Sequence, residues 1–156
     1  MLLVASVASQ AQDIKIGYVN SERVLKEANP AKAAQAKLEA EFGKREKDLA
    51  EVANRLKATA DRLDKDGPTL SDTERTRRQR DLVEQDREFQ RKRREFQEDL
   101  NQRKNEELAS VVERANKVIK QIFDQEKYDL IVQDAVHWSA RVDITKKVID
   151  ALNAGK

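Results

Sequence analysis

Residues 64–74 read DKDGPTLSDTE, and this stretch separates two long segments that both have helical hydrophobic patterns. Gly67 can adopt the left-handed backbone conformation that ends many helices, and Pro68 prevents the helix from continuing. Ser71 to Glu74 has the sequence of a capping box, which starts a new helix. The stretch therefore predicts that two helices meet at a tight turn and run back along each other.

The segment before the turn carries a narrow heptad stripe. A Leu or Phe recurs every seventh residue, at Phe42, Leu49, Leu56, Leu63 and Leu70. The companion heptad position holds Leu38 and Val52, but Arg45 and Thr59 also occupy it. Such an interrupted pattern is typical of a weak coiled-coil seam.

The segment after the turn has a stripe of its own. Leu82, Phe89 and Phe96 are spaced by sevens, Leu100 shifts the register, and apolar residues become denser towards Phe123. The two stripes predict an antiparallel helical hairpin over residues 30–123, with its tip near 66–71. The regular period also argues against disorder, which 38% charged residues would otherwise suggest.

The outer part of the second helix is locally basic. Residues 75–94 hold nine Lys or Arg and four acids, an excess of +5 (9 − 4). The candidate basic set leaves out Arg87 and consists of the other eight, Arg75, Arg77, Arg78, Arg80, Arg91, Lys92, Arg93 and Arg94. Each residue alone is most simply interpreted as part of a solvated, ion-paired helix face. Together they could attract acidic surfaces or phosphate groups.

The segments that flank the hairpin predict a small β-rich body, at residues 12–29 and 124–156. Ile14, Ile16 and Tyr18 alternate as in a strand, and a short helix capped by Ser21 follows. Asn29 and Pro30 predict a break and a restart of the helix. Alternation over 128–133 and again over 136–142 predicts further strands, and Asp143 is expected to cap a last amphipathic helix. The predicted class is therefore α+β, mostly α.

The apolar residues of this body form a second candidate set. They are Ile14, Ile16, Tyr18, Leu130, Val132, Trp138, Val142, Ile144, Val148, Ile149 and Leu152. A body of about fifty residues buries too little surface to be reliably stable alone. We therefore predict an obligate homo-oligomer in which several chains share it.

The first eleven residues differ from the rest of the chain. They form a short apolar run that ends in small residues, which favours the remnant of a signal peptide with cleavage before Gln12, although the basic start of such a peptide is missing. The alternative is a tail that is disordered or pairs as a strand. No other run approaches the roughly 18 apolar residues of a membrane span.

The residue types argue against catalysis. The chain has no Cys and one histidine, His137, so a metal centre built from these ligands is not expected. The four glycines are isolated, which excludes a glycine-rich phosphate loop. The carboxylates have basic neighbours and no pocket to raise a pKa. We expect neither an enzyme nor a cofactor.

Several motifs resemble the Skp family of periplasmic chaperones, also called OmpH-like. They are IGYVNSERVL (residues 16–25), LEAEF (38–42), YDLIVQDAVHW (128–138) and VDITKKVIDAL (142–152). The resemblance covers about Ile14 to Leu152, and the two ends carry its specificity because any charged coiled coil shares the middle.

The resemblance implies a homotrimer in the periplasm of a Gram-negative cell envelope. In the family, three hairpins hang from a β-rich body around a cavity and hold unfolded outer-membrane proteins without ATP. The candidate client-binding residues on the arms are then Phe42, Leu49, Leu82, Phe89, Phe96 and Leu100. Basic arm residues of the family are also linked to lipopolysaccharide, so an anionic membrane surface is a further candidate partner, with residues 91–94 as its contact.

Two other functions remain as alternatives. A structural coiled-coil or adaptor protein of the cell envelope would need a continuous exposed patch for a folded partner, and the apolar residues here are dispersed. A nucleic-acid binder would need aromatic residues among its cations or a strong net charge, and this chain carries only +2. Nucleic acid is therefore an unlikely partner.

Overall fold

The computed structural model describes residues 13–155, so the expected signal-peptide remnant lies outside the described residues. The chain divides into two compact units. The hairpin unit consists of residues 33–110, and the body unit is built from the two ends, up to residue 32 and from residue 111 onward. The functional domain bounds expected from the sequence, with an arm over 30–123, stay a prediction.

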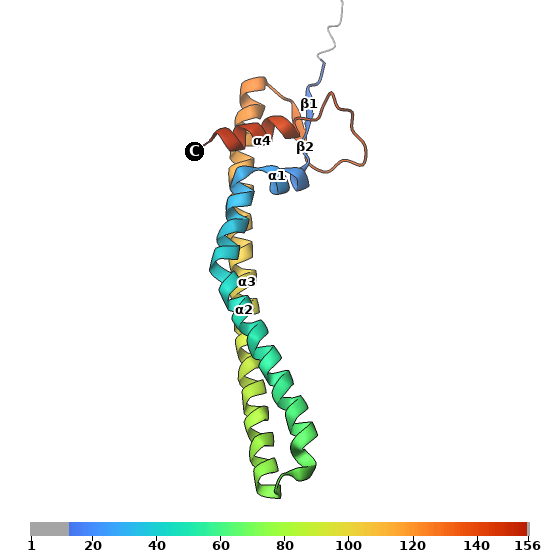
Figure 1. Cartoon of the computed structure of the whole chain (residues 1–156). Helices are drawn as coiled ribbons and strands as arrows, with labels where there is room; N and C mark the ends of the chain where they lie inside the picture. Colours follow the sequence, from blue (N-terminus) through green and yellow to red (C-terminus); the bar gives the residue numbers. More distant parts are fainter. Residues whose placement is uncertain (1–12, 156) are drawn as a thin grey trace, which may run out of the picture. The chain divides into compact units, whose positions relative to one another are not determined.

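Within the described residues, seven short and long elements follow one another (Figure 1). They are β1 (Ile16–Tyr18), α1 (Ser21–Glu27), α2 (Asn29–Asp66), the 3-10 turn η1 (Gly67–Thr69), α3 (Asp72–Glu126), β2 (Leu130–Val132) and α4 (Thr145–Ala154). The fold is mostly helical with a small β part. This confirms the predicted class.

The sheet of the body unit joins the two ends of the described chain. β1 pairs with β2 in parallel, with Ile16 opposite Leu130 and Tyr18 opposite Val132. Parallel strands need a long crossover, and here α1, α2 and α3 all lie between them in sequence. Gly17 lies close to its neighbours, because a Cβ there would stand 3.0 Å from Cδ1 of Ile144.

The core of the body unit gathers side chains from all its helices. The buried members are Val19, Val24, Ala28, Ala115, Ile122, Tyr128, Ile144, Val148, Ile149 and Leu152. The amphipathic α4 contributes Val148, Ile149 and Leu152, as its sequence pattern predicts, and Ile144 is its cap residue.

The strand predicted over residues 136–142 is absent; within residues 13–155 the sheet has only β1 and β2. Trp138 is turned back onto Tyr18, with ring centroids 4.0 Å apart and 29° between the ring planes. Its Nε1 donates a hydrogen bond to Oδ2 of Asp143 at 3.4 Å. The backbone N–H of Val142 donates to the carbonyl of Ser139, which closes a turn where the alternating sequence suggested a strand.

Several helix ends differ from expectation by one residue. Asn20 rather than Ser21 caps α1, because its Oδ1 accepts from the backbone N–H of Arg23 at 2.9 Å. Ile144 holds the cap position of α4, although Oδ1 of Asp143 does accept from the N–H of Thr145 at 2.9 Å. The expected restart of the helix at residue 29 is confirmed, with the break at residue 28.

The predicted turn between α2 and α3 is found at the expected residues, but the expected conformation of Gly67 is wrong. Gly67 is not left-handed; it opens a single 3-10 turn that Pro68 extends. A tight 3-10 turn reverses the chain without a positive φ angle. Ser71 then starts α3 as predicted, since its Oγ accepts from the N–H of Glu74 at 3.3 Å.

The hairpin unit pairs α2 with α3 as antiparallel helices, which Figure 1 shows side by side. Phe42 is 4% exposed and meets the ring of Phe96 edge to face. Arg45, which the heptad pattern marked as a gap in the seam, instead links the helices. Its Nη1 lies 2.9 Å from Oδ2 of Asp99, and its guanidinium lies 5.6 Å from the centroid of each Phe ring.

Candidate functional site

The six candidate client-binding residues all lie along the seam between α2 and α3. Phe42 is buried, and the other five, Leu49, Leu82, Phe89, Phe96 and Leu100, are half-buried. Their role in binding a client stays a prediction. In a single chain, however, they already pack within the hairpin, so a client would have to share or displace these contacts.

Among the residues that the structure describes, ion pairs cross between the two helices only in the part of the hairpin unit that is far from the turn. We call this the inner part. The ion pairs join Lys37 to Glu107, Glu41 to Arg103 and Arg45 to Asp99. We call these three pairs the inner clamp. From residue 46 to residue 98 the helices have no such link in the described chain, and half-buried apolar side chains provide the packing there.

Arg103 is the centre of the inner clamp. Its guanidinium donates hydrogen bonds to Glu106 and Glu107 on its own helix and to Oε2 of Glu41 on the other, at 3.2 Å. The bonds to Glu106 and Glu41 hold the pKa of Arg103 above its usual value. Arg103 therefore stays charged at any pH that proteins meet.

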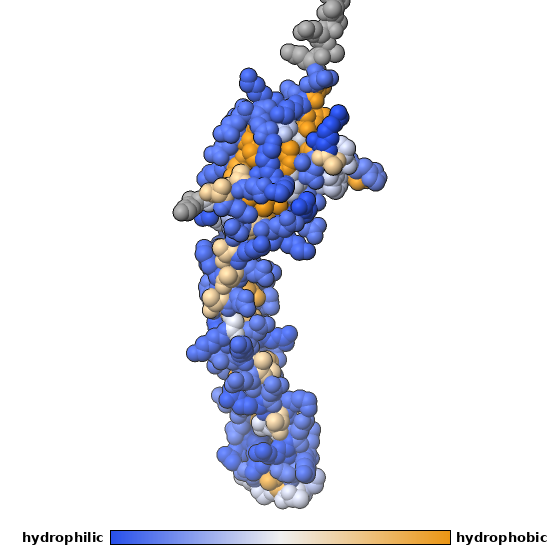
Figure 2. Space-filling model, turned by 45° about the horizontal axis from the view of Figure 1, so that its top comes forward, coloured by the Kyte–Doolittle hydropathy of each residue, from blue (hydrophilic) through white to orange (hydrophobic). Residues whose placement is uncertain are grey.

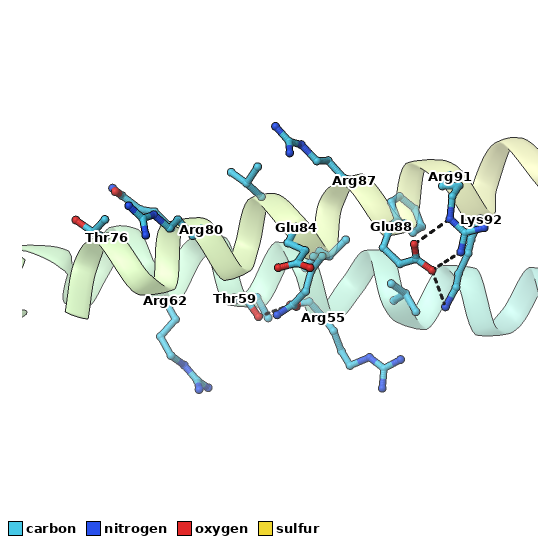
Figure 3. Close-up of a pocket in the computed structure, with 17 residues that line it drawn as sticks. Arg55, Thr59, Arg62, Thr76, Arg80, Glu84, Arg87, Glu88, Arg91 and Lys92 are labelled. Carbon is cyan, nitrogen blue, oxygen red and sulfur yellow. Dashed lines mark hydrogen bonds and ion pairs between the residues drawn. The ribbon is translucent and has the colours of Figure 1, made fainter. Parts of the chain in front are cut away.

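A groove of about 1500 Å³ lies between α2 and α3 in the unclamped part (Figure 3). Its apolar lining consists of Val52, Leu56, Ala58, Val83 and Phe89. Its charged lining consists of Arg55, Arg62, Arg80, Arg87, Arg91, Lys92, Glu84 and Glu88. Six cations therefore face two acids around an apolar strip.

The sequence patterns did not indicate two of these cations as part of a site. Arg55 and Arg62 lie on α2, outside the basic run of the second helix, and only the pairing of the hairpin brings them beside residues 80–91. The two heptad stripes indicate that the helices pair, but the ion pairs of the inner clamp set the register, because the residue numbers of each pair sum to 144.

The basic set separates into paired and unpaired members. Five have a carboxylate within 4.0 Å on their own helix: Arg75, Arg77, Arg78, Arg91 and Lys92. Arg80, Arg93 and Arg94 have none within the described residues 13–155. Hydrogen bonds from Arg77 and Arg78 lower the pKa of Glu74 to about 2. The sequence-based expectation of a largely ion-paired face thus fits part of the patch.

The body unit exposes a group of large apolar side chains. Leu25 and Val112 are exposed on its helices. The group near the strands and in the loop after β2 consists of Ile14 (72% exposed), Ile16 (42%), Leu130 (48%), Val136 (88%) and Trp138 (43%). We call this group the body face. Figure 2 shows hydrophobic residues gathered on the visible side of the body unit, whereas the visible side of the hairpin unit is mostly hydrophilic. Clustered apolar exposure marks an interaction surface.

The predicted body residues divide between this face and the interior. Tyr18, Ile144, Val148, Ile149 and Leu152 are buried within the chain, and Val132 and Val142 are half-buried. Val136 was not in the predicted set, although it is the most exposed of the large apolar residues. The predicted strand over 136–142 did not indicate this exposure. Val136 is exposed because a loop takes the place of that strand.

No metal-binding arrangement is found in the described part of the chain. Residues 13–155 contain no group of His, Asp and Glu side chains able to hold a metal ion. His137 is exposed on the loop before α4. Among the helices described, none is long and apolar enough to cross a bilayer.

Comparison with known proteins identifies the family. The profile of the family described as outer membrane protein (OmpH-like) matches residues 15–152, nearly the whole described chain. The chain belongs to the OmpH-like family. The match includes both the body unit and the hairpin unit, so the resemblance seen in the end motifs is confirmed.

Curated relatives of this OmpH-like chain are chaperones. It is 29% identical over 151 residues to the chaperone protein Skp of Pectobacterium atrosepticum, with 96% of this chain and 91% of the relative covered. It is 30% identical over 138 residues to the chaperone protein Skp of Photorhabdus laumondii, with 88% and 83% covered. The family is thus one of chaperones and not of enzymes.

A solved structure shows the same fold. The crystal structure of an OmpH-like outer membrane chaperone from Caulobacter crescentus superimposes with a TM-score of 0.74, at 21% sequence identity. The match covers 98% of this chain and 91% of that chain. The fold of the OmpH-like chain, mostly helical with a small sheet, therefore has an experimental counterpart.

Proposed function

We propose that the chain is an ATP-independent holdase of the periplasm, which binds unfolded outer-membrane β-barrel proteins between its helical arms and prevents their aggregation. Family membership supports the general role of an outer membrane protein chaperone. The observation that carries the finer proposal is the unclamped outer hairpin, where apolar side chains are half-buried and ion pairs do not cross between the helices.

This geometry suits a client that is released without ATP hydrolysis. The strands of an unfolded barrel protein expose alternate apolar residues and aggregate through their edges in water. Half-buried Leu and Phe along the arm offer many weak apolar contacts, each of which can be exchanged. The surrounding charges keep arms from adhering to one another. Release then requires only a more favourable destination.

A homotrimer is part of the proposal, and the body face supports it. Ile14 and Val136 leave most of their side chains in water in a single chain. Burial of these residues against other copies would remove apolar surface from water and place several arms around one cavity. Enclosure between arms raises the effective concentration of weak contacts for one client.

The basic patch supports a second candidate partner. Arg93 and Arg94 are exposed and have no carboxylate within 4.0 Å in the described chain, so they can meet the phosphates of lipopolysaccharide or of another anionic membrane surface. Such contacts would weaken as salt is added.

The test measures light scattering after an unfolded outer-membrane barrel protein is diluted from urea into nucleotide-free buffer, with and without the purified chain from Gln12 onward. The mass is recorded by multi-angle light scattering. Suppression at about one trimer per client, together with a trimeric mass, is the expected result. A stable oligomer that leaves aggregation unchanged would overturn the holdase function and favour the envelope adaptor.

A further inference from the structure

We infer that the groove between α2 and α3 is itself a binding site, for an extended polypeptide segment that carries both acidic and apolar side chains. This inference rests on the proposed function and deepens it, because it places part of the client within one hairpin rather than only in the space between several arms. All lining residues, from Val52 to Lys92, belong to the hairpin unit.

The apolar strip of the groove fits an extended chain. Val83 is 50% exposed, and Val52, Leu56 and Phe89 are half-buried, so each has a free side. They form separate apolar spots, because polar residues such as Thr59 and Gln79 also line the groove. An extended segment presents every second side chain to one face, and its apolar residues can reach such spots one at a time.

The charges around the groove are not balanced within the chain. Glu88 accepts from Arg91 at 2.6 Å and lies 3.6 Å from Lys92, so these two cations are already engaged, as the dashed lines in Figure 3 show. The other four cations, Arg55, Arg62, Arg80 and Arg87, have no carboxylate within 4.0 Å in the described chain. Among the groove-lining acids of the described chain, only Glu84 has no ion-pair partner and could balance these four cations.

The unpaired cations are placed where a bound segment could meet them. Figure 3 shows Arg55 and Arg62 extending to one side of the paired helices and Arg87 to the other, while Glu88 turns towards Arg91 and Lys92. Long arginine side chains can fold over a ligand while their stems cover its apolar parts. Their guanidinium groups bind carboxylates with two parallel hydrogen bonds. A segment with acidic residues therefore supplies the charge that the groove lacks.

The lack of cross-links explains how the segment enters. Between residues 46 and 98 of the described chain, separation of the two helices breaks no ion pair that joins them. The inner clamp at Arg45 and Arg103 keeps the helices together on the side of the groove that is farther from the turn. An acyl chain fits less well, because it needs a continuous apolar channel, and the apolar residues here are interrupted.

The experiment uses two probes on the full chain from Gln12 onward. One is a fluorescent peptide that alternates Glu with Leu, and its control alternates Lys with Leu; binding is followed by anisotropy. The other is a vesicle that contains phosphatidylglycerol. Arg80→Glu/Arg87→Glu changes the groove. Lys104→Glu/Arg114→Glu is the matched control, because it reverses two cations on the same helix that lie outside the groove and have no carboxylate within 4.0 Å in the described chain.

The groove variant is expected to weaken binding of the acidic peptide by about tenfold, and the control by less than about threefold, since the control changes only the general field. Val83→Ser should likewise weaken it more than Leu108→Ser, a change at a residue of similar exposure, 50% against 48%. Arg55→Gln/Arg62→Gln gives a second groove variant on α2. Helical content by circular dichroism confirms that each variant folds.

Equal losses in groove and control variants would overturn the inference, because binding would then follow total charge. So would a groove variant that loses the vesicle but keeps the peptide, which would assign the groove to an anionic lipid. Tight binding of the peptide that alternates Lys with Leu would also overturn the inference, because the groove would then not select acidic side chains. The aggregation assay is separate: peptide binding in the groove without suppression would contradict the holdase function alone, and suppression without groove dependence would contradict only this inference.

Discussion

Phe42 and Phe96 meet edge to face across the hairpin, with ring centroids 5.9 Å apart and 74° between the ring planes. Arg45 lies over both rings and also pairs with Asp99. The aromatic pair therefore stands at the outer edge of the inner clamp. Beyond it, towards the turn, the helices depend on half-buried apolar residues, so this contact divides a fastened part of the hairpin from a looser one.

The first prediction concerns this aromatic pair. Phe42→Ala should lower the free energy of unfolding by about 3 kcal/mol, because it leaves a cavity at a buried ring. Leu108→Ala is the control, with a change below about 0.5 kcal/mol at an exposed position. Urea unfolding followed by circular dichroism, at one protein concentration, measures both. Equal effects of the two changes would contradict the packing described here.

Two glycines should respond in opposite directions to the same substitution. A Cβ at Gly17 would meet Ile144, Tyr128 and Ile131 at 3.0 to 3.3 Å, so Gly17→Ala should destabilise the body unit by about 1 to 3 kcal/mol through overpacking. A Cβ at Gly43, within α2, meets nothing within 4 Å. Gly43→Ala should therefore stabilise the helix by about 0.5 to 1 kcal/mol. Melting temperatures that move in the same direction would refute this contrast.

The third prediction is the titration of Glu74. Hydrogen bonds from Arg77 and Arg78 lower its pKa from 4.5 to about 2 in the folded chain. The folded form thus holds its proton less tightly than the unfolded form. The contribution of Glu74 to stability is present above pH 4.5 and is lost as the pH falls from 4.5 towards 2. Glu74→Gln should remove this part of the acid dependence.

The chemical shift of the Glu74 carboxyl carbon, followed by NMR against pH, measures the effect directly. Arg77→Gln/Arg78→Gln should move the midpoint back towards 4.5 because both donors are lost. A midpoint near 4.5 in the unchanged chain would show that these exposed pairs do not persist in solution, where such pairs are often weak.

The fourth prediction concerns assembly. Val136→Asp should raise the concentration at which the oligomer dissociates by about tenfold or more, since a charge would have to lose water in the interface. Leu108→Asp, in the hairpin unit, should leave the mass unchanged. Light scattering over a dilution series measures both. An unchanged mass for Val136→Asp would remove Val136 from the interface.

Much of the fold could be predicted because local rules and tertiary structure agree there. The period of Phe42 to Leu70 and of Leu82 to Phe96 fixed the hairpin, and Pro68 fixed its turn. Ser71 and residue 29 marked helix starts correctly, since caps and prolines act within a few residues. The motifs at both ends indicated the family, which the comparisons confirmed.

What could not be predicted depends on contacts that are distant in sequence. Residues 136–142 alternate like a strand, but the stack of Trp138 on Tyr18 directs them into a loop. Arg45 looked like a fault in the seam because its partner Asp99 lies on the other helix. For the same reason the groove was missed, as neither Arg55 nor Arg80 signals it without the other.

The parallel pairing of β1 with β2 sets an order of folding. Ile16 and Leu130 are partners but stand 114 positions apart (130 − 16). At roughly 5 to 20 residues per second, a growing chain exposes β1 for on the order of ten seconds before its partner has been synthesised. All residues of the hairpin unit, 33–110, have been synthesised before Leu130 is added, so they can already contact one another. The arm can therefore form early, and the closing of the sheet becomes the last step, one that a truncated chain never reaches.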